Sequence, residues 1–167
     1  ENSGFIIPFS FPLYSIILCL IILYIFNLFN KLYLGDSGAY LLGFLFSLEL
    51  INFYLQNNNV SPFFIILLLW YPAFENLFSI LRKTNLRKSP IVPDTNHLHQ
   101  LIFLYFRRKN YSFLKANNIT GISINIYNGI IMMTAITNPS YSQLQITLII
   151  VNLFVYTFFY MRLFKYK

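Results

Sequence analysis

Five long apolar runs decide what this chain can fold into. They cover about residues 12–30, 38–56, 61–81, 119–137 and 143–164. Each run is close to the roughly 20 residues that a helix needs to cross a bilayer. Lipid offers no hydrogen-bond partner to open backbone groups, so each run is predicted to form a helix. We therefore predict an all-α fold, a multi-span transmembrane helical bundle with about five spans and a large loop over residues 82–118.

The composition excludes a water-soluble domain. Hydrophobic residues make up 57% of the chain, and charged residues only 10%. So few charges cannot cover a water-facing surface. The single cysteine, Cys19, lies inside an apolar run and has no partner for a disulfide within the sequence, so we interpret it as a packing residue.

The basic residues all fall on one predicted side of the membrane. Five spans in series place the turn at 31–37, the loop at 82–118 and the C-terminal residues 162–167 on the same side. All 12 Lys and Arg lie there, and none lies on the other side. The positive-inside rule predicts that this side is cytoplasmic. The amphipathic stretch 97–108 is expected to lie along it.

Asp36 stands between two apolar runs and is flanked by Gly35 and Gly38. Two interpretations are compatible with this placement. In the first, Asp36 or Ser37 caps a helix that begins near Gly38, because short polar side chains accept hydrogen bonds from the first backbone N–H groups. In the second, the helix N-terminus holds a phosphate group and the carboxylate holds Mg²⁺, which takes one or two protein carboxylates together with phosphate oxygens.

His97 and His99 lie in the predicted loop, together with Asp94. Two histidines alone do not make a zinc site, which takes three or four ligands. Near lysine and arginine, histidines can instead bind phosphate or transfer a proton. A plain solvated loop is the alternative. The membrane face that Asp36 shares with these three residues favours a site.

Two glutamates lie inside apolar runs. A charge at the centre of a bilayer costs at least about 2.5 kcal/mol on insertion scales. Glu75 is predicted to lie near the cytoplasmic interface, since Arg82 follows it in the sequence by about two helical turns. Glu49 is predicted to lie deeper. We interpret both as acids that face the interior of the bundle and pair with a polar group there.

Three blocks of the sequence resemble the polyprenyl-phosphate N-acetylhexosamine-1-phosphate transferases. FNLFNKLYLGDSGAYLLGF (26–44) is similar to the family block that contains Gly-Asp-x-Gly. YPAFENLFSILRK (71–83) is similar to a Pro-x-x-Asp stretch that ends in Arg-Arg. SPIVPDTNHLHQLIF (89–103) is similar to a Pro-Asp segment followed by His-x-His-His. Their order and spacing also fit, so the chain resembles the C-terminal half of this family, closest to its glycan-initiating branch.

The resemblance implies roles for six residues. Asp36 is implied as the catalytic aspartate and as the ligand of Mg²⁺, for which Mn²⁺ can substitute. Substrate-binding roles are implied for Asn27 near the diphosphate, Tyr33 on the uracil ring, and Asp94, His97 and His99 at the sugar nucleotide.

Several positions depart from the family pattern. Gln100 replaces the last histidine of His-x-His-His, Thr95 stands where many members have arginine, and Glu75 replaces an aspartate. The family's paired aspartates and its Asn-Asp-Gly-x-Asp-Gly block belong to the earlier half and do not occur in this sequence. We therefore expect this half to be inactive alone and to need the missing N-terminal half as a partner.

The implied reaction transfers N-acetylhexosamine 1-phosphate from a UDP-N-acetylhexosamine to polyprenyl (undecaprenyl) phosphate and releases UMP. Its implied place is the cytoplasmic face of a bacterial inner membrane, where it starts a cell-envelope glycan such as the O-antigen of lipopolysaccharide. Expected partners are both substrates, membrane lipid and a second copy in a homodimer, but no nucleic acid. The alternatives are a non-catalytic membrane remnant and a transporter-like bundle that uses Glu49 and Glu75.

Overall fold

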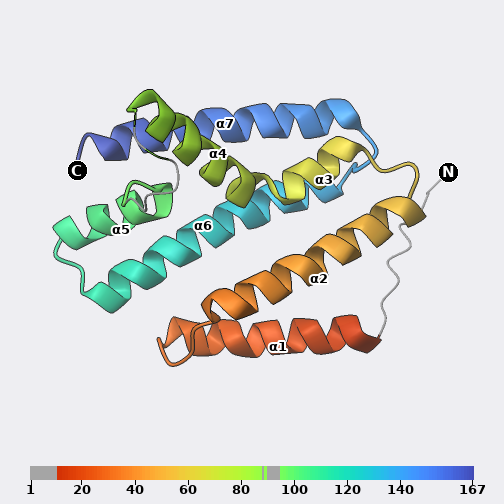
Figure 1. The fold of residues 1–167 in the computed structure, drawn as a ribbon, viewed down its shortest axis with the longest axis horizontal. Coiled ribbons are helices and arrows are strands. Elements are labelled where there is room, and N and C mark those ends of the chain that lie inside the picture. Colours follow the sequence, from red (N-terminus) through yellow and green to blue (C-terminus); the bar gives the residue numbers. More distant parts are fainter. Residues whose placement is uncertain (1–10, 88, 90–94) are drawn as a thin grey trace. The chain divides into compact units, whose positions relative to one another are not determined.

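The computed structural model describes residues 11–87, 89 and 95–167, and every regular element among them is an α-helix. The chain divides into two compact units that meet in sequence at Val60 and Ser61. The first unit contains α1 (Phe11–Leu28) and α2 (Gly35–Gln56). The second contains α3 (Pro62–Leu68), α4 (Trp70–Asn85), α5 (Leu98–Arg108), α6 (Phe113–Ile136) and α7 (Ser142–Phe164) (Figure 1). The all-α prediction is confirmed.

Three of the described helices are long and apolar enough to cross a membrane: α2, α6 and α7. The pair α3 and α4 passes the same test only when the two helices are taken together. The apolar part of α1 that the structure describes, Tyr14–Leu28, is shorter than a span. The helices thus occupy the five predicted places and give three to four spans by length and composition, which supports a membrane-helical bundle.

The predicted span over residues 61–81 is broken rather than straight. Helix α3 ends at Leu68, α4 begins at Trp70, and the axis bends by 74° between them. Pro72 explains the break, since it has no N–H for the carbonyl of Leu68 and its ring clashes with that carbonyl. At the other end of α3, Pro62 is well placed at the first helical position, and the Ser61 hydroxyl accepts from the N–H of Phe63 at 3.2 Å.

The segment predicted as a loop between spans, residues 82–118, is largely helical in the structure. It contains the end of α4, all of α5 and the first turn and a half of α6, which begins at Phe113 rather than near Ile119. The early start has a local cause, because the Ser112 hydroxyl accepts from the N–H of Lys115 at 3.3 Å and caps the helix. The length of an apolar run in the sequence does not reveal such a cap.

The core of the second unit lies where α5 packs against α6 and α7 and where α3 packs against the same two helices. Aromatic rings join α4 to α7: Phe74 lies 4.9 Å from Tyr156 and Phe78 lies 4.7 Å from Tyr160, centroid to centroid. Both pairs are edge-to-face, the arrangement that ring quadrupoles favour. These contacts fix the face of α4 that carries its polar residues.

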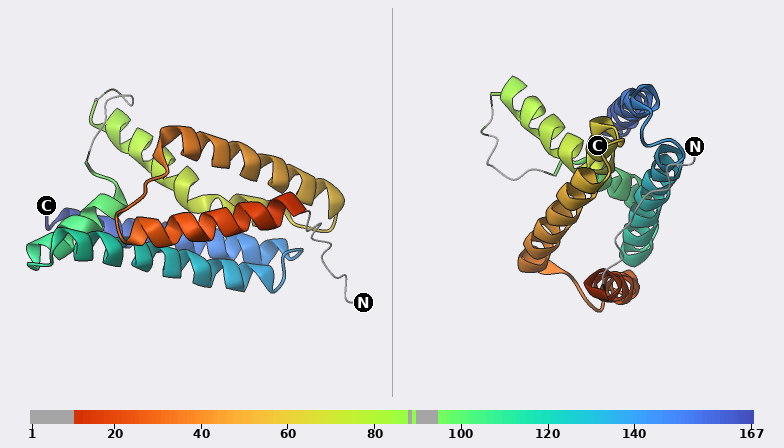
Figure 2. Two further views of the ribbon diagram at one scale, coloured as in Figure 1. Left: turned by 90° about the horizontal axis from the view of Figure 1, so that it is seen from below. Right: turned by 90° about the vertical axis from the view of Figure 1, so that its right-hand side faces the viewer.

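The charged ends of the helices gather at one end of the second unit. Figures 1 and 2 show the C-terminal ends of α4, α5 and α7 and the N-terminal end of α6 together there. Basic residues lie in the last turns of α4, α5 and α7 and in the first turn of α6. The turn at the opposite end, residues 137–141, has no charged residue. Within this unit, the arrangement agrees with the predicted one-sided charge distribution.

Candidate functional site

The turn between α1 and α2 carries two of the predicted substrate-binding residues. The Asn27 amide donates to the carbonyl of Leu32 at 3.3 Å, and the Tyr33 hydroxyl donates to the side-chain oxygen of Asn30 at 2.9 Å. Asn30 has a φ of 53°, in the left-handed region that asparagine tolerates. These local bonds shape the turn and leave the Tyr33 side chain 64% exposed.

Asp36 lies in the first turn of α2 and does not cap it. Gly35 has a φ of +68° and lets the chain turn into a helix that begins at Gly35 itself. The N-cap position belongs to Leu34, which makes no side-chain cap bond, so the predicted cap at Asp36 or Ser37 is wrong. A Cβ on Gly38 would lie 2.6 Å from the end of the Leu34 side chain, so a larger residue there would require the leucine side chain to move.

The surroundings of Asp36 fit one ligand of a magnesium ion, with further ligands supplied from elsewhere. Its carboxylate is exposed beside the free N–H groups of a helix N-terminus, where the dipole favours negative charge. Among the described residues, no three His, Cys, Asp or Glu side chains converge as a metal site. One carboxylate suits Mg²⁺ when phosphate oxygens and water complete the octahedron.

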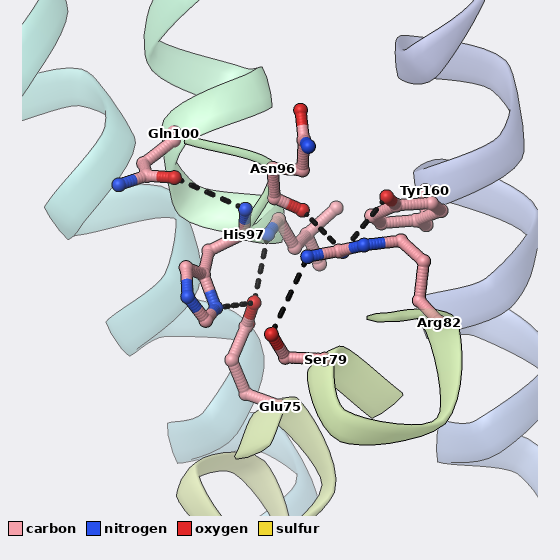
Figure 3. Close-up of polar contacts among 8 residues, drawn as sticks. Glu75, Ser79, Arg82, Asn96, His97, Gln100 and Tyr160 are labelled. Carbon is pink, nitrogen blue, oxygen red and sulfur yellow. Dashed lines mark hydrogen bonds and ion pairs between the residues drawn. The ribbon is translucent and has the colours of Figure 1, made fainter. Parts of the chain in front are cut away.

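Glu75 anchors the first turn of α5 from a different helix. Its carboxylate Oε1 accepts from the backbone N–H of Leu98 at 2.8 Å and lies 3.1 Å from Nδ1 of His97 (Figure 3). The Glu75 residue is 7% exposed, and the Leu98 residue is 7% exposed. The carboxylate therefore satisfies a buried N–H at a helix N-terminus, where negative charge is favoured. The same oxygen lies within hydrogen-bond distance of Nδ1 and therefore orients the His97 ring.

Arg82 holds the residue that precedes His97. Its guanidinium donates to the carbonyl of Asn96 at 2.7 Å and to the Tyr160 hydroxyl at 2.9 Å (Figure 3). The same group donates to the Ser79 hydroxyl at 3.3 Å. The spacing of Glu75, Ser79 and Arg82 by four and three residues puts all three on one face of α4. Two charged side chains of α4 thus hold residues 96–98 at both ends.

His97 and His99 are brought together by the start of α5. His97 is the N-cap residue and has extended backbone angles, whereas His99 already lies inside the helix. Their rings stack with 5.6 Å between centroids and an angle of 17°. Gln100 accepts from the N–H of His97 at 3.1 Å, so the residue that departs from the family pattern stabilises this turn.

His99 differs from an ordinary histidine in its proton affinity. Partial burial of the ring lowers the pKa of His99 below 6.5. The carboxylate of Glu75 opposes this shift, and the neighbouring His97 adds to it. At neutral pH, the His99 ring is therefore neutral and can donate from one ring nitrogen and accept at the other.

The structure divides the predicted site residues between its two units. Asn27, Tyr33 and Asp36 lie in the first unit, and the stacked pair His97 and His99 lies in the second. A sixth predicted residue, Asp94, lies outside the described residues.

Two residues of the site, Glu75 and Arg82, were not predicted as functional from the sequence. The signal that could have found them is their helical spacing with Ser79 in an otherwise apolar run.

Two known transferases are similar to part of this chain. An undecaprenyl-phosphate alpha-N-acetylglucosaminyl 1-phosphate transferase of Thermotoga maritima is 30% identical over 106 residues, which cover 58% of this chain and 34% of the relative. A probable undecaprenyl-phosphate N-acetylglucosaminyl 1-phosphate transferase of Bacillus subtilis is 34% identical over 77 residues, which cover 45% and 21%. The chain is similar to this family of transferases.

These relatives confirm the resemblance predicted from the three sequence blocks. The chain spans about a third or less of the length of the two transferases that it matches. No protein-family profile matches the chain. No solved structure matches it either.

Proposed function

We propose that the protein transfers N-acetylhexosamine 1-phosphate from a UDP-N-acetylhexosamine to polyprenyl phosphate and releases UMP. The names of the two similar proteins support a transferase that acts on undecaprenyl phosphate and supplies N-acetylglucosamine 1-phosphate. The structural observation that supports the proposal is the fixed arrangement of His97 and His99. Glu75 and the first turn of α5 hold His97 and His99 in one stacked arrangement, as a binding site requires and a solvated loop does not.

In the proposed reaction, a phosphate oxygen of polyprenyl phosphate attacks the β-phosphorus of the UDP-sugar. A new P–O bond forms on the acceptor, the bond from that phosphorus to the bridging oxygen breaks, and UMP leaves. Phosphoryl transfer of this kind depends on positioning and on neutralisation of charge. His97 and His99 bind the nucleotide phosphates, and Asp94 belongs to the same nucleotide-binding segment.

The turn between α1 and α2 supplies the other proposed contacts. The exposed ring of Tyr33 stacks on uracil, and the Asn27 amide lies near the diphosphate. Asp36 holds Mg²⁺ (or Mn²⁺), which when bound neutralises the negative charge of the phosphates. Because the chain spans about a third or less of its relatives, we propose that a further N-terminal half completes the site.

The proposed location is a bacterial inner membrane with the site on the cytoplasmic face. The described spans support a membrane protein, and the gathering of basic residues at one end of the second unit supports this orientation. The proposed role is the first membrane step of a cell-envelope glycan, with O-antigen as one such product.

Asp36→Asn in the natural gene product tests the proposal. In membrane vesicles supplied with UDP-N-acetylglucosamine, polyprenyl phosphate and Mg²⁺, we expect UMP release to fall at least about 100-fold, as for loss of a charge-stabilising group. Glu49→Gln, which removes a carboxylate from the same helix, is the matched control and should stay close to wild type. Activity of Asp36→Asn near the wild-type rate would contradict the assignment.

A further inference from the structure

A cavity of about 330 Å³ lies in the second unit where α4, α5, α6 and α7 meet. Its walls include the side chains of Trp70, Tyr105, Phe106, Ser123 and Phe159. Nearly all of these groups present carbon to the interior. A space of this size and character takes an apolar chain or ring rather than a sugar or a nucleotide.

Two lysines lie close to the part of this cavity that α5 forms. The Lys109 ammonium lies 4.6 Å from the centroid of the Tyr105 ring, which is part of the wall. The wall residue Phe106 packs edge-to-face on Tyr111 at 5.6 Å. Tyr111 in turn has the Lys115 ammonium 5.2 Å above its ring. Two lysines are thus linked to the cavity through one or two aromatic rings.

The segment that carries these two lysines has no carboxylate to balance its positive charge. Residues 95–167 contain seven lysines and arginines and no aspartate or glutamate. All seven are exposed. Membrane sidedness accounts for basic residues at this end of the unit. It does not account for an apolar cavity beside them, so the combination calls for a ligand with an anionic head and an apolar tail.

We propose that this cavity, together with Lys109 and Lys115 beside it, binds an anionic glycerophospholipid of the surrounding bilayer. One acyl chain fills the cavity, and the headgroup phosphate lies between Lys109 and Lys115. The bilayer itself supplies this ligand at high local concentration, and anionic headgroups are attracted to clustered Lys and Arg at the membrane surface. The proposal is independent of the transferase function.

The chain's single tryptophan makes the proposal testable, because Trp70 lines the cavity and is 5% exposed. The protein is reconstituted in vesicles in which either phosphatidylglycerol or phosphatidylcholine carries bromine on its acyl chains. We expect bromo-phosphatidylglycerol to reach half-maximal quenching of Trp70 at about a fivefold lower mole fraction than bromo-phosphatidylcholine. Equal quenching by the two lipids would overturn the proposal.

Two pairs of variants separate the cavity from general membrane contact. Ser123→Phe fills the cavity wall on α6 and should remove the preference for phosphatidylglycerol. Thr134→Phe is its control on the same helix, since both hydroxyls donate to the carbonyl four residues earlier and both side chains are exposed. Lys109→Gln should raise the half-quenching mole fraction about fivefold, whereas Arg87→Gln removes an exposed charge elsewhere and should not.

Helicity measured by circular dichroism shows which variants fold. If Ser123→Phe unfolds the protein, Lys109→Gln and Arg87→Gln still decide the matter. Equal effects of these two substitutions would contradict the role assigned to Lys109.

Unlabelled polyprenyl phosphate provides the last test. If it relieves the quenching and unlabelled phosphatidylglycerol does not, the cavity belongs to the transferase substrate and the proposal is wrong.

Discussion

Glu75 and His97 lie 22 residues apart in sequence, and a buried carboxylate oxygen joins them at 3.1 Å. The same oxygen accepts from the backbone N–H of Leu98. A carboxylate in the middle of an apolar run thereby becomes the support of the histidine pair. This relationship links the broken span to the candidate site, since Glu75 lies on α4, the helix that follows the break.

Removal of the Glu75 carboxylate is expected to destabilise the protein. Glu75→Ala leaves the buried N–H of Leu98 without its acceptor, and an unsatisfied buried donor costs about 1–3 kcal/mol. Glu75→Gln keeps an oxygen that can accept from Leu98, so its loss in the free energy of unfolding should be smaller. Denaturant unfolding in detergent measures both. Glu49→Ala, on a helix in which the structure buries no residue, is the control and should change stability by less than about 0.5 kcal/mol.

Lysine in place of Arg82 is expected to loosen the segment before α5. Nη1 of Arg82 donates to the Asn96 carbonyl and the Tyr160 hydroxyl, and Nη2 donates to the Ser79 hydroxyl. A lysine has one terminal nitrogen and cannot reproduce this planar arrangement of two donors. We expect Arg82→Lys to cost about 1–3 kcal/mol and to speed hydrogen exchange at the Leu98 amide. Arg87→Lys, at an exposed position, is the comparison. Equal exchange rates in the two variants would show that Arg82 does not hold this segment.

Alanine in place of Pro72 is expected to straighten the broken span. The substitution restores an N–H that can bond to the carbonyl of Leu68 and removes the ring that clashes with it. From the rise of 1.5 Å per residue, the distance between spin labels at residues 63 and 81 should increase by about 5 Å. Pro62→Ala at the first helical position should leave the distance unchanged. An unchanged distance in Pro72→Ala would mean that tertiary packing alone maintains the bend.

The lowered pKa of His99 predicts a loss of stability in acid. The unfolded residue has its ordinary pKa of 6.5, and the folded residue has a lower one, so the folded state binds fewer protons between the two values. The contribution of His99 to the free energy of unfolding is fully present above the pKa of the unfolded state. It is lost as the pH falls through the lower pKa of the folded state. His99→Gln should therefore flatten the dependence on pH as the pH falls below the unfolded value of 6.5. Parallel curves for the variant and the wild type would contradict this expectation.

Much of the fold could be predicted from the sequence, for a direct physical reason. Apolar length and the need to satisfy backbone groups in lipid predict helices at five places, and helices lie at all five. The ends of the helices depend on local features that apolar length does not reveal. The start of α6 depends on a cap at Ser112, and the break after Leu68 depends on Pro72, a residue that transmembrane helices can also accommodate without ending.

The candidate site could be predicted only in its separate parts. The sequence indicated Asp36, His97 and His99 by their residue types and by the blocks around them. It did not indicate that Glu75 supports His97, since a hydrogen bond across 22 residues depends on how two helices pack. The expected cap at Asp36 also failed, because one positive φ at Gly35 moves the helix start.

The sequence by itself determined that this protein is helical, suited to a membrane and basic on one side, because these properties follow from apolar length and from the order of charges along the chain. The tertiary structure decided which polar groups act together. Glu75 and Arg82 reach residues 96–98 only because α4 turns at Leu69 and packs its aromatic face on α7, which brings one end of α4 to the start of α5.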